Sequence, residues 1–219
     1  IIDIVPNHMA ADIRNPWWRD VLELGRPSRY AGFFDIDWRD PDLEVRGKIL
    51  LPCLGDSLDA CLERGELALA FDAEIGGIVC RYFDQAFPLS PRPRDEMAPD
   101  TFGPGRDPGR HWLRDILMMQ HYRLTCWRDA ATRINWRRFF DINQLVALRM
   151  DRADVFAAYH RRVLELFRDE IIDGLRVDHI DGLADPGAYC RRLRAALRGV
   201  RDVEPYIVVE KILDRDESQ

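Results

Sequence analysis

The sequence has no apolar run near the ~20 residues that a membrane-spanning helix requires. We therefore expect no helical membrane span. Lysine is also scarce: the lysines are Lys48 and Lys211, the arginines are spread along the chain, and the net charge is −6. Because nucleic-acid-binding surfaces are usually strongly basic, this charge argues against a nucleic-acid partner.

The five cysteines form no Cys-x-x-Cys pair, the spacing typical of zinc and redox sites. Their number is odd, so we expect reduced thiols in a cytoplasmic protein. An initiator methionine is absent, and residue 1 already lies in an apolar segment. The chain is therefore expected to be an internal fragment of a longer protein. Its 47% hydrophobic and 32% charged residues are ordinary for a globular protein.

Three short apolar segments each end in polar residues. They are residues 1–5 before Asn7 and His8, residues 171–177 before Asp178 and His179, and residues 206–209 before Glu210. Buried parallel strands are runs of apolar and β-branched residues, and a (β/α) barrel exposes its functional side chains at the carboxyl ends of such strands. The pattern predicts an α/β fold with a site at the carboxyl edge of a parallel sheet.

The segment between the second and third strands has the pattern of a helix. Asp185 followed by Pro186 is a typical N-cap and first helical residue, an apolar stripe at helical spacing follows, and Gly199 is predicted to end the helix. Strand, helix and strand together have about the length of one βαβ unit. Asp178 and Glu210 should therefore lie at the same end of neighbouring parallel strands.

Two carboxyl groups about 5 Å apart suit a retaining glycosidase, because one attacks carbon while the other transfers the proton. Arg176 lies two residues before Asp178, so both side chains should face one side of the strand. A neighbouring guanidinium favours the ionised carboxylate that a nucleophile requires. An acid at a strand end can instead be only a cap or a loop residue. A metal site at Asp178, His179 and Asp181 is not expected, because successive strand side chains diverge.

The strand-end residues resemble those of a known family. Asp3-x-x-x-Asn7-His8, Gly174-x-Arg176-x-Asp178 and Glu210 resemble the first three conserved regions of the α-amylase superfamily of glycoside hydrolases. Further segments resemble the maltooligosyltrehalose synthase branch of that superfamily. They are Asn15-Pro16-Trp17-Trp18, residues 30–38, 120–124 and 137–142, and Val209-Glu210-Lys211-Ile212-Leu213.

The resemblance implies a partial TIM (β/α)8 barrel, about strands three to five, with a large inserted lobe after the first strand. Residues 1–8 would be a barrel strand, residues 9–150 the lobe, and residues 151–219 a barrel segment of helix, strand, helix and strand. Local patterns predict further elements. They are helices at 16–24, 57–64, 111–124 and 154–167, a hairpin of strands 66–71 and 78–83, and a mobile loop at 88–108.

The resemblance also implies roles for individual residues. Asp178 would be the nucleophile and Glu210 the general acid/base. Arg176 would orient Asp178, Asp3 would hold Arg176, and Asn7 would be structural near the site. The implied substrate contacts are His8, Arg176, His179, Asp181, Lys211, Phe139 and Phe140.

One position departs from the α-amylase pattern. The third and fourth residues after the nucleophile are typically Lys-His in α-amylases, and here they are Asp181 and Gly182. This difference argues against simple hydrolysis of starch. The paired aromatic residues Phe139 and Phe140 fit either a packed core or a surface that stacks on sugar rings.

The implied reaction is an isomerisation, in which the reducing-end α-1,4 linkage of a maltooligosaccharide becomes an α,α-1,1 linkage without a cofactor. The alternatives are an α-amylase-type hydrolase or glucanotransferase and a non-catalytic glycan-binding relative. The resemblance implies maltooligosyltrehalose trehalohydrolase as a pathway partner. The family's third catalytic Asp has no counterpart among these residues, so the chain alone is expected to be inactive.

Overall fold

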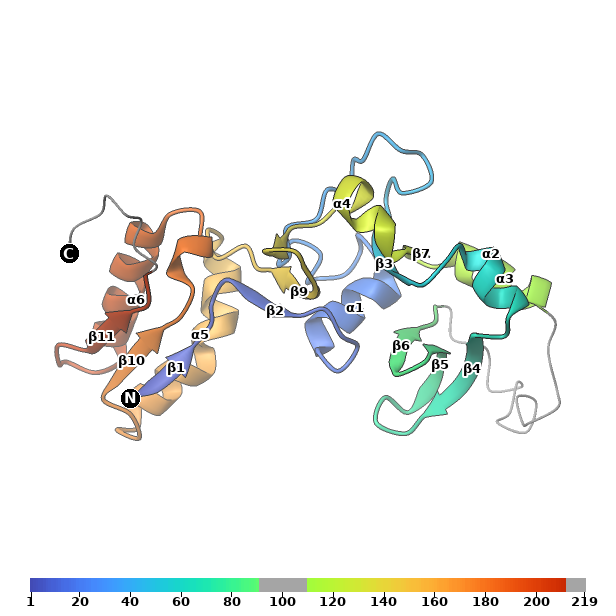
Figure 1. Cartoon of the computed structure of the whole chain (residues 1–219). Helices are drawn as coiled ribbons and strands as arrows, with labels where there is room; N and C mark the ends of the chain where they lie inside the picture. The colour runs from blue at the N-terminus through green and yellow to red at the C-terminus, as the bar shows by residue number, and fades with distance from the viewer. Residues whose placement is uncertain (91–109, 212–219) are drawn as a thin grey trace. The chain divides into compact units, whose positions relative to one another are not determined.

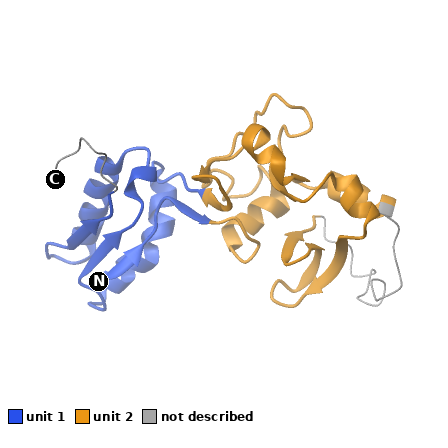
Figure 2. Ribbon diagram, viewed as in Figure 1, with its two compact units in different colours: residues 1–9, 147–219 blue, residues 10–146 orange. Residues whose placement is uncertain are grey.

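The computed structural model describes residues 1–90 and 110–211, so most of the predicted loop at 88–108 lies outside the described residues. The chain divides into two compact units, Ile1–Met9 with Ala147–Gln219 and Ala10–Val146 (Figure 2). The assignment of residues 1–8 and 151–219 to a barrel and of 9–150 to a lobe stays a proposal. Among the described helices, none is both long and apolar enough to cross a membrane.

The first unit contains a parallel sheet of three strands (Figure 1). Its strands are β1 (Ile2–Ile4), β10 (Gly174–Val177) and β11 (Tyr206–Val209), in the order β1-β10-β11. The helices of this unit are α5 (Ala153–Arg168) and α6 (Pro186–Val200), and a single 3₁₀ turn, η3, spans Ile180–Gly182. The sequence therefore predicted the α/β class and the parallel pairing correctly.

Helix α6 begins as predicted. The side chain of Asp185 accepts a hydrogen bond from the backbone N–H of Ala188, and Pro186 is the first helical residue. The prediction that Gly199 ends the helix is wrong. The backbone N–H of Arg201 still donates to the carbonyl of Leu197 at 3.1 Å, so the helix continues for a further residue.

The second strand is shorter than the predicted 171–177. Residues before Gly174 belong to the turn after α5, where Glu170 has a positive φ of 58° and Ile171 donates to the carbonyl of Leu166 at 3.0 Å. Gly174 allows β10 and β11 to approach closely, because a Cβ there would lie 2.4 Å from the carbonyl oxygen of Tyr206.

Helices α5 and α6 are joined by a fully buried histidine. The Nδ1 atom of His160 lies 2.8 Å from the carbonyl of Phe156, and its Nε2 atom lies 2.8 Å from the hydroxyl of Tyr189. The Nδ1–H tautomer satisfies both contacts, because Nδ1 then donates to the carbonyl and Nε2 accepts from the hydroxyl. Burial lowers the pKa of His160 from 6.5 to about 4.

This histidine should make the protein less stable in acid. As the pH falls below about 6.5, the histidine is protonated in the unfolded chain, whereas in the folded protein it stays neutral until about pH 4. The free energy of unfolding should therefore fall between these two pH values by up to ~3 kcal/mol. Denaturant unfolding of the full-length protein at several pH values measures the slope. The His160→Gln variant should show a flatter slope, and equal slopes in both proteins would contradict the assignment.

The second unit is built from small sheets and short helices. Its helices are α1 (Pro16–Leu24), α2 (Leu58–Glu63), α3 (Arg110–Met119) and α4 (Ala130–Arg133), with a 3₁₀ turn η2 at Trp127–Asp129. Its strands are β3 (Ile49–Leu54), β4 (Leu67–Asp72), β5 (Gly77–Tyr82), β6 (Gln85–Pro88), β7 (Tyr122–Cys126), β8 (Arg138–Phe139) and β9 (Ile142–Ala147). Strand β2 (His8–Ala10) lies where the chain passes from the first unit into the second.

The structure confirms most of the local predictions for this unit. Helix α1 begins after the Asn15 cap and ends at Gly25, and helix α2 follows the Ser57 cap. The predicted hairpin is β4 paired antiparallel with β5, and β6 adds a third strand that the sequence did not predict. Trp18 is fully buried, so it belongs to the core rather than to an exposed aromatic surface.

The predicted helix at 111–124 is wrong over its last five residues, 120–124. Helix α3 ends at Met119, and residues 122–126 form β7, which pairs parallel with β3. The reason is burial, because Tyr122 and Leu124 alternate into the core. Lys48 stabilises the boundary between α3 and β7. Its Nζ donates to the carbonyls of Met118 and Gln120 at 2.9 and 2.6 Å, which satisfies acceptors at the end of the helix.

Candidate active site

The two predicted acids lie at the carboxyl ends of neighbouring parallel strands. The backbone N–H of Asp178 donates to the carbonyl of Ile4 at 2.9 Å, and that of Glu210 donates to the carbonyl of Val177 at 2.8 Å. Each acid therefore continues the hydrogen bonding of the sheet one residue beyond its strand. The hydrogen-bonded backbone fixes the positions from which the two acidic side chains extend. A functional site on regular strands depends on such rigid support.

Arg176 joins three carboxylates. Its side chain lies opposite Asp3 in the register of β1 and β10, and its Nη1 donates to Asp3 Oδ2 at 3.1 Å. The same nitrogen contacts Asp178 Oδ1, and Nη2 lies 3.7 Å from Glu210 Oε1. One guanidinium therefore contacts both predicted catalytic acids through its two terminal nitrogens. Its positive charge attracts both acids, and its planar shape sets the two nitrogens in fixed directions.

The two acids differ in exposure. The side chain of Asp178 is 20% exposed and that of Glu210 is 36% exposed. Buried Oδ1 of Asp178 makes no hydrogen bond of ordinary geometry, although it contacts Arg176. Asp178 is thus an ion-paired and partly buried side chain, and Glu210 is the more exposed of the two acids.

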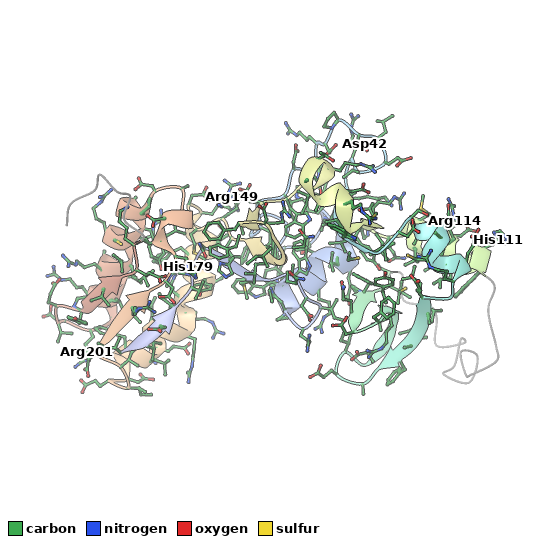
Figure 3. All side chains as sticks on the ribbon, in the orientation of Figure 1. Asp42, His111, Arg114, Arg149, His179 and Arg201 are labelled. Atoms are coloured by element: carbon green, nitrogen blue, oxygen red, sulfur yellow. The ribbon has the colours of Figure 1, made fainter. Side chains whose placement is uncertain are left out.

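His179 has a strained backbone at the site. Its φ is 53°, a left-handed conformation that is uncommon for a residue other than glycine. In this conformation its backbone N–H donates to Glu210 Oε2 at 3.2 Å, and its Nδ1 lies 3.3 Å from the same oxygen. His179 therefore holds one oxygen of Glu210 while Arg176 contacts the other. Figure 3 labels His179 at the end of β10.

Asn7 and His8 support this turn from the end of the first strand. Asn7 is buried, and its Nδ2 donates to the carbonyl of His179 at 2.9 Å. The Nδ1 atom of His8 faces Asn7 Oδ1, and the His8 and His179 rings lie 6.0 Å apart between centroids. Burial, and then the nearby His179, lowers the pKa of His8. The neutral imidazole of His8 can both donate and accept hydrogen bonds.

In the sequence Gly182 stands out only as a departure from the α-amylase pattern, and the structure gives it a packing role. A Cβ at Gly182 would lie 2.2 Å from Asn7 Nδ2, so the absent side chain lets Asn7 reach the carbonyl of His179. A glycine just after a strand-end acid is the signal that could have indicated this role. Beside it, Lys211 Nζ lies 3.7 Å from Asp181 Oδ1.

The first unit thus brings together most of the predicted site residues. They are Asp3, Asn7, His8, Arg176, Asp178, His179, Asp181, Glu210 and Lys211. Phe139 and Phe140 belong to the other unit, where their rings lie 4.5 Å apart and Phe140 is 71% exposed. The catalytic and substrate-binding roles of all these residues stay predictions.

Two carboxylates at the ends of neighbouring parallel strands, both in contact with one guanidinium, are the arrangement that the sequence predicted. The fold and the site therefore define an α/β protein with an acid pair at the carboxyl edge of its parallel sheet, as the resemblance to the α-amylase superfamily implies.

Comparison with known proteins is consistent with this class. The chain is 39% identical over 220 aligned residues to a Mycobacterium tuberculosis protein named "Putative maltooligosyl trehalose synthase", and the match covers 100% of this chain and 24% of that protein. It superposes on a crystal structure of maltooligosyl trehalose synthase with a TM-score of 0.75 and 34% identity, over 99% of this chain and 25% of the other. The enzyme of that name from Arthrobacter ramosus gives a TM-score of 0.75 and 37% identity, over 100% and 25% of the two chains. No family model matches the sequence.

Along its whole length, the chain is homologous to a segment of the maltooligosyl trehalose synthases, as the sequence motifs indicated. It spans about a quarter of the length of the curated relatives that it matches.

Proposed function

We propose that the full-length protein is an intramolecular glucosyl transferase, a (1→4)-α-D-glucan 1-α-D-glucosylmutase. It converts the reducing-end α-1,4 linkage of a maltooligosaccharide to an α,α-1,1 linkage, which gives maltooligosyltrehalose. The observation that carries this proposal is the contact of Asp178 and Glu210 with one guanidinium at the carboxyl edge of a parallel sheet. Similarity to proteins named maltooligosyl trehalose synthase supports the choice of reaction.

In the first half of the proposed reaction, Glu210 protonates the glycosidic oxygen of the last α-1,4 bond while Asp178 attacks the anomeric carbon. The position of Asp178 directly after β10, in contact with Arg176, suits it to this role. The greater exposure of Glu210 suits proton transfer. The C–O bond breaks, and a covalent glycosyl-enzyme forms.

In the second half, the released glucose turns so that its anomeric hydroxyl faces the intermediate. Glu210 now removes the proton of that hydroxyl, and the resulting attack forms the α,α-1,1 bond and frees Asp178. Two inversions retain the configuration at the donor carbon. Water must be kept out, because the same intermediate reacts with water to give hydrolysis. The two carboxylates carry out both steps without a cofactor.

The wider architecture in this proposal is a (β/α)8 barrel. Strands β1, β10 and β11 would be about its third to fifth strands, and their parallel pairing in this order supports that assignment. Residues 9–150 would form the inserted lobe.

The five free cysteines support a cytoplasmic location. A maltooligosyltrehalose trehalohydrolase would be the pathway partner that consumes the product.

The test is to incubate the full-length protein with maltopentaose and to measure reducing ends, free glucose and non-reducing product. Isomerisation removes reducing ends without shortening the chain. An α-amylase-type hydrolase or a glucanotransferase would give shorter or redistributed reducing sugars instead, and a glycan-binding relative would leave maltopentaose unchanged. Either of these results would overturn the proposal.

The balance between isomerisation and hydrolysis should depend on residues that guard the acceptor glucose. The resemblance implies that His179 and Phe140 contact the substrate. We therefore expect His179→Ala and Phe140→Ala to raise the ratio of free glucose to trehalose-ended product, because a smaller side chain at a substrate contact admits water to the glycosyl-enzyme. The ratio after complete conversion of maltopentaose is the measurement.

Phe83→Ala is a closely matched control for Phe140→Ala. Phe83 and Phe140 are both 71% exposed, and both have a positive φ, 53° for Phe83 and 50° for Phe140. Each also packs on the aromatic ring of the residue before it. The ratio for Phe83→Ala should equal that of the parent protein. If His179→Ala and Phe140→Ala also leave the ratio unchanged, neither residue guards the acceptor.

A further inference from the structure

A cavity of about 200 Å³ lies within the unit Ala10–Val146. Its base is apolar and rigid, because Trp18, Leu22, Phe87 and Trp136 line it and are buried. The indole N–H of Trp136 donates to the carbonyl of Leu50 at 2.7 Å, which fixes that ring in place. The cavity is therefore a preformed hollow in a packed core, as most small-molecule sites are.

Trp127 lines the cavity and is 55% exposed. It lies in η2, directly after β7, and the guanidinium of Arg128 stacks on its ring at 5.0 Å from the centroid. A tryptophan ring that lines a cavity and remains half exposed offers a flat apolar surface that a ligand can cover.

Two primary amides line the same cavity. The exposed side chains of Gln85 and Gln144 make no hydrogen bond to another side chain or to the backbone among the described residues. Each amide can donate and accept at once. A third amide, that of Asn143, is already held by Arg138 Nη1 at 2.6 Å and so forms a fixed part of the wall.

The lining contains no lysine or arginine, and its carboxylate, Asp12, is neutralised by Arg14 through contacts of 2.9 Å at both carboxylate oxygens. No side chain of the lining itself therefore offers a cation to a phosphate or to another strongly charged ligand. Drug-sized ligands occupy ~300–1,000 Å³, so this cavity has room for about one ring rather than a chain. An uncharged ring with one apolar face and several hydroxyls matches both the indole and the amides.

We propose that this cavity binds a single uncharged sugar ring, which places its apolar face on Trp127 and its hydroxyls at Gln85 and Gln144. The residues that line the cavity indicate a sugar ring. That the ring is a glucose unit rests on the proposed function. The acids of the first unit contribute no residue to the cavity. The cavity would thus be an additional point at which the protein holds its glucan.

Hydrogen–deuterium exchange in the full-length protein, with maltose as the probe, tests the proposal locally. Maltose should slow exchange in peptides that contain residues 85–88 and 126–129. In Trp127→Ala the maltose concentration for half of this effect should rise about tenfold, because stacking is lost. In Gln85→Ala it should rise about threefold, because a hydrogen bond is lost. Because Gln85 is exposed, we expect Gln85→Ala to fold. This variant therefore still tests the proposal if Trp127→Ala does not fold.

Phe71→Ala is the matched control, because Phe71 lies in the same unit, is 57% exposed, and does not line the cavity. Its response to maltose should equal that of the parent. The proposal is overturned if maltose leaves these peptides unaffected, if Trp127→Ala and Gln85→Ala respond like the parent, or if adenosine protects the peptides and maltose does not. Product formation from maltopentaose is assayed separately, so a failure of the proposed reaction is distinguishable from a failure of this site.

Discussion

Asp178→Asn in the full-length protein should lower turnover of maltopentaose by at least ~1000-fold, the order of magnitude that a positioned catalytic group supplies. The amide keeps the shape of the side chain but cannot attack the anomeric carbon. Arg176 still contacts the same position, so binding of substrate should largely survive. The measurement is kcat and KM, and kcat should carry the loss.

Glu210→Gln should lower turnover by a similar factor, because the amide cannot donate or accept the proton in either half of the reaction. Matched controls lie close by in the sequence. Asp173→Asn and Glu204→Gln remove exposed acids at the start of β10 and before β11, and both should retain near-parental turnover. A near-parental rate for purified Asp178→Asn would exclude Asp178 as the nucleophile.

Arg176→Leu is the second substitution with a large expected effect. It leaves the carboxylates of Asp3, Asp178 and Glu210 close together without the cation that contacts all three. The two predicted catalytic acids should then move apart, and a shift of about 1 Å costs on the order of 100-fold in rate. We expect a loss of that size in kcat, with a smaller change in KM, because Arg176 acts by positioning the acids.

Arg176→Lys separates positioning from simple charge. A lysine ammonium is a single point charge and cannot contact Asp178 and Glu210 through two fixed nitrogens. Its kcat should therefore lie between those of the parent and Arg176→Leu. Thermal unfolding of each variant checks that the loss of rate is not a loss of fold. A folded Arg176→Leu protein with parental kcat would show that the acids need no guanidinium.

Several helices and strands were predictable from the sequence, because each depends on neighbouring residues. Asp185 and Pro186 fix the start of α6, and Asn15, Pro16 and Gly25 fix both ends of α1. The apolar runs before Asp178 and Glu210 also fix which residues follow the strands. Capping hydrogen bonds and side-chain periodicity act within a few residues, so the sequence displays them directly.

Other features depended on contacts between distant residues. Tyr122 and Leu124 continue a helical pattern in the sequence, yet pairing with β3 makes them part of a strand. The third strand of the antiparallel sheet, β6, also escaped prediction, although it pairs with β5 next to it in the chain. For β7, burial against a distant segment outweighed the local preference.

The sequence by itself determined which residues are candidates for the chemistry, namely the acids, the arginine and the polar residues at strand ends, because residue type and strand position are local properties. Only the tertiary structure decided that Arg176 also reaches Glu210, that the left-handed turn at His179 presents its N–H to Glu210, and that Gln85 and Trp127 line one cavity. Sheet register and side-chain packing set these contacts, and they join residues far apart in the chain.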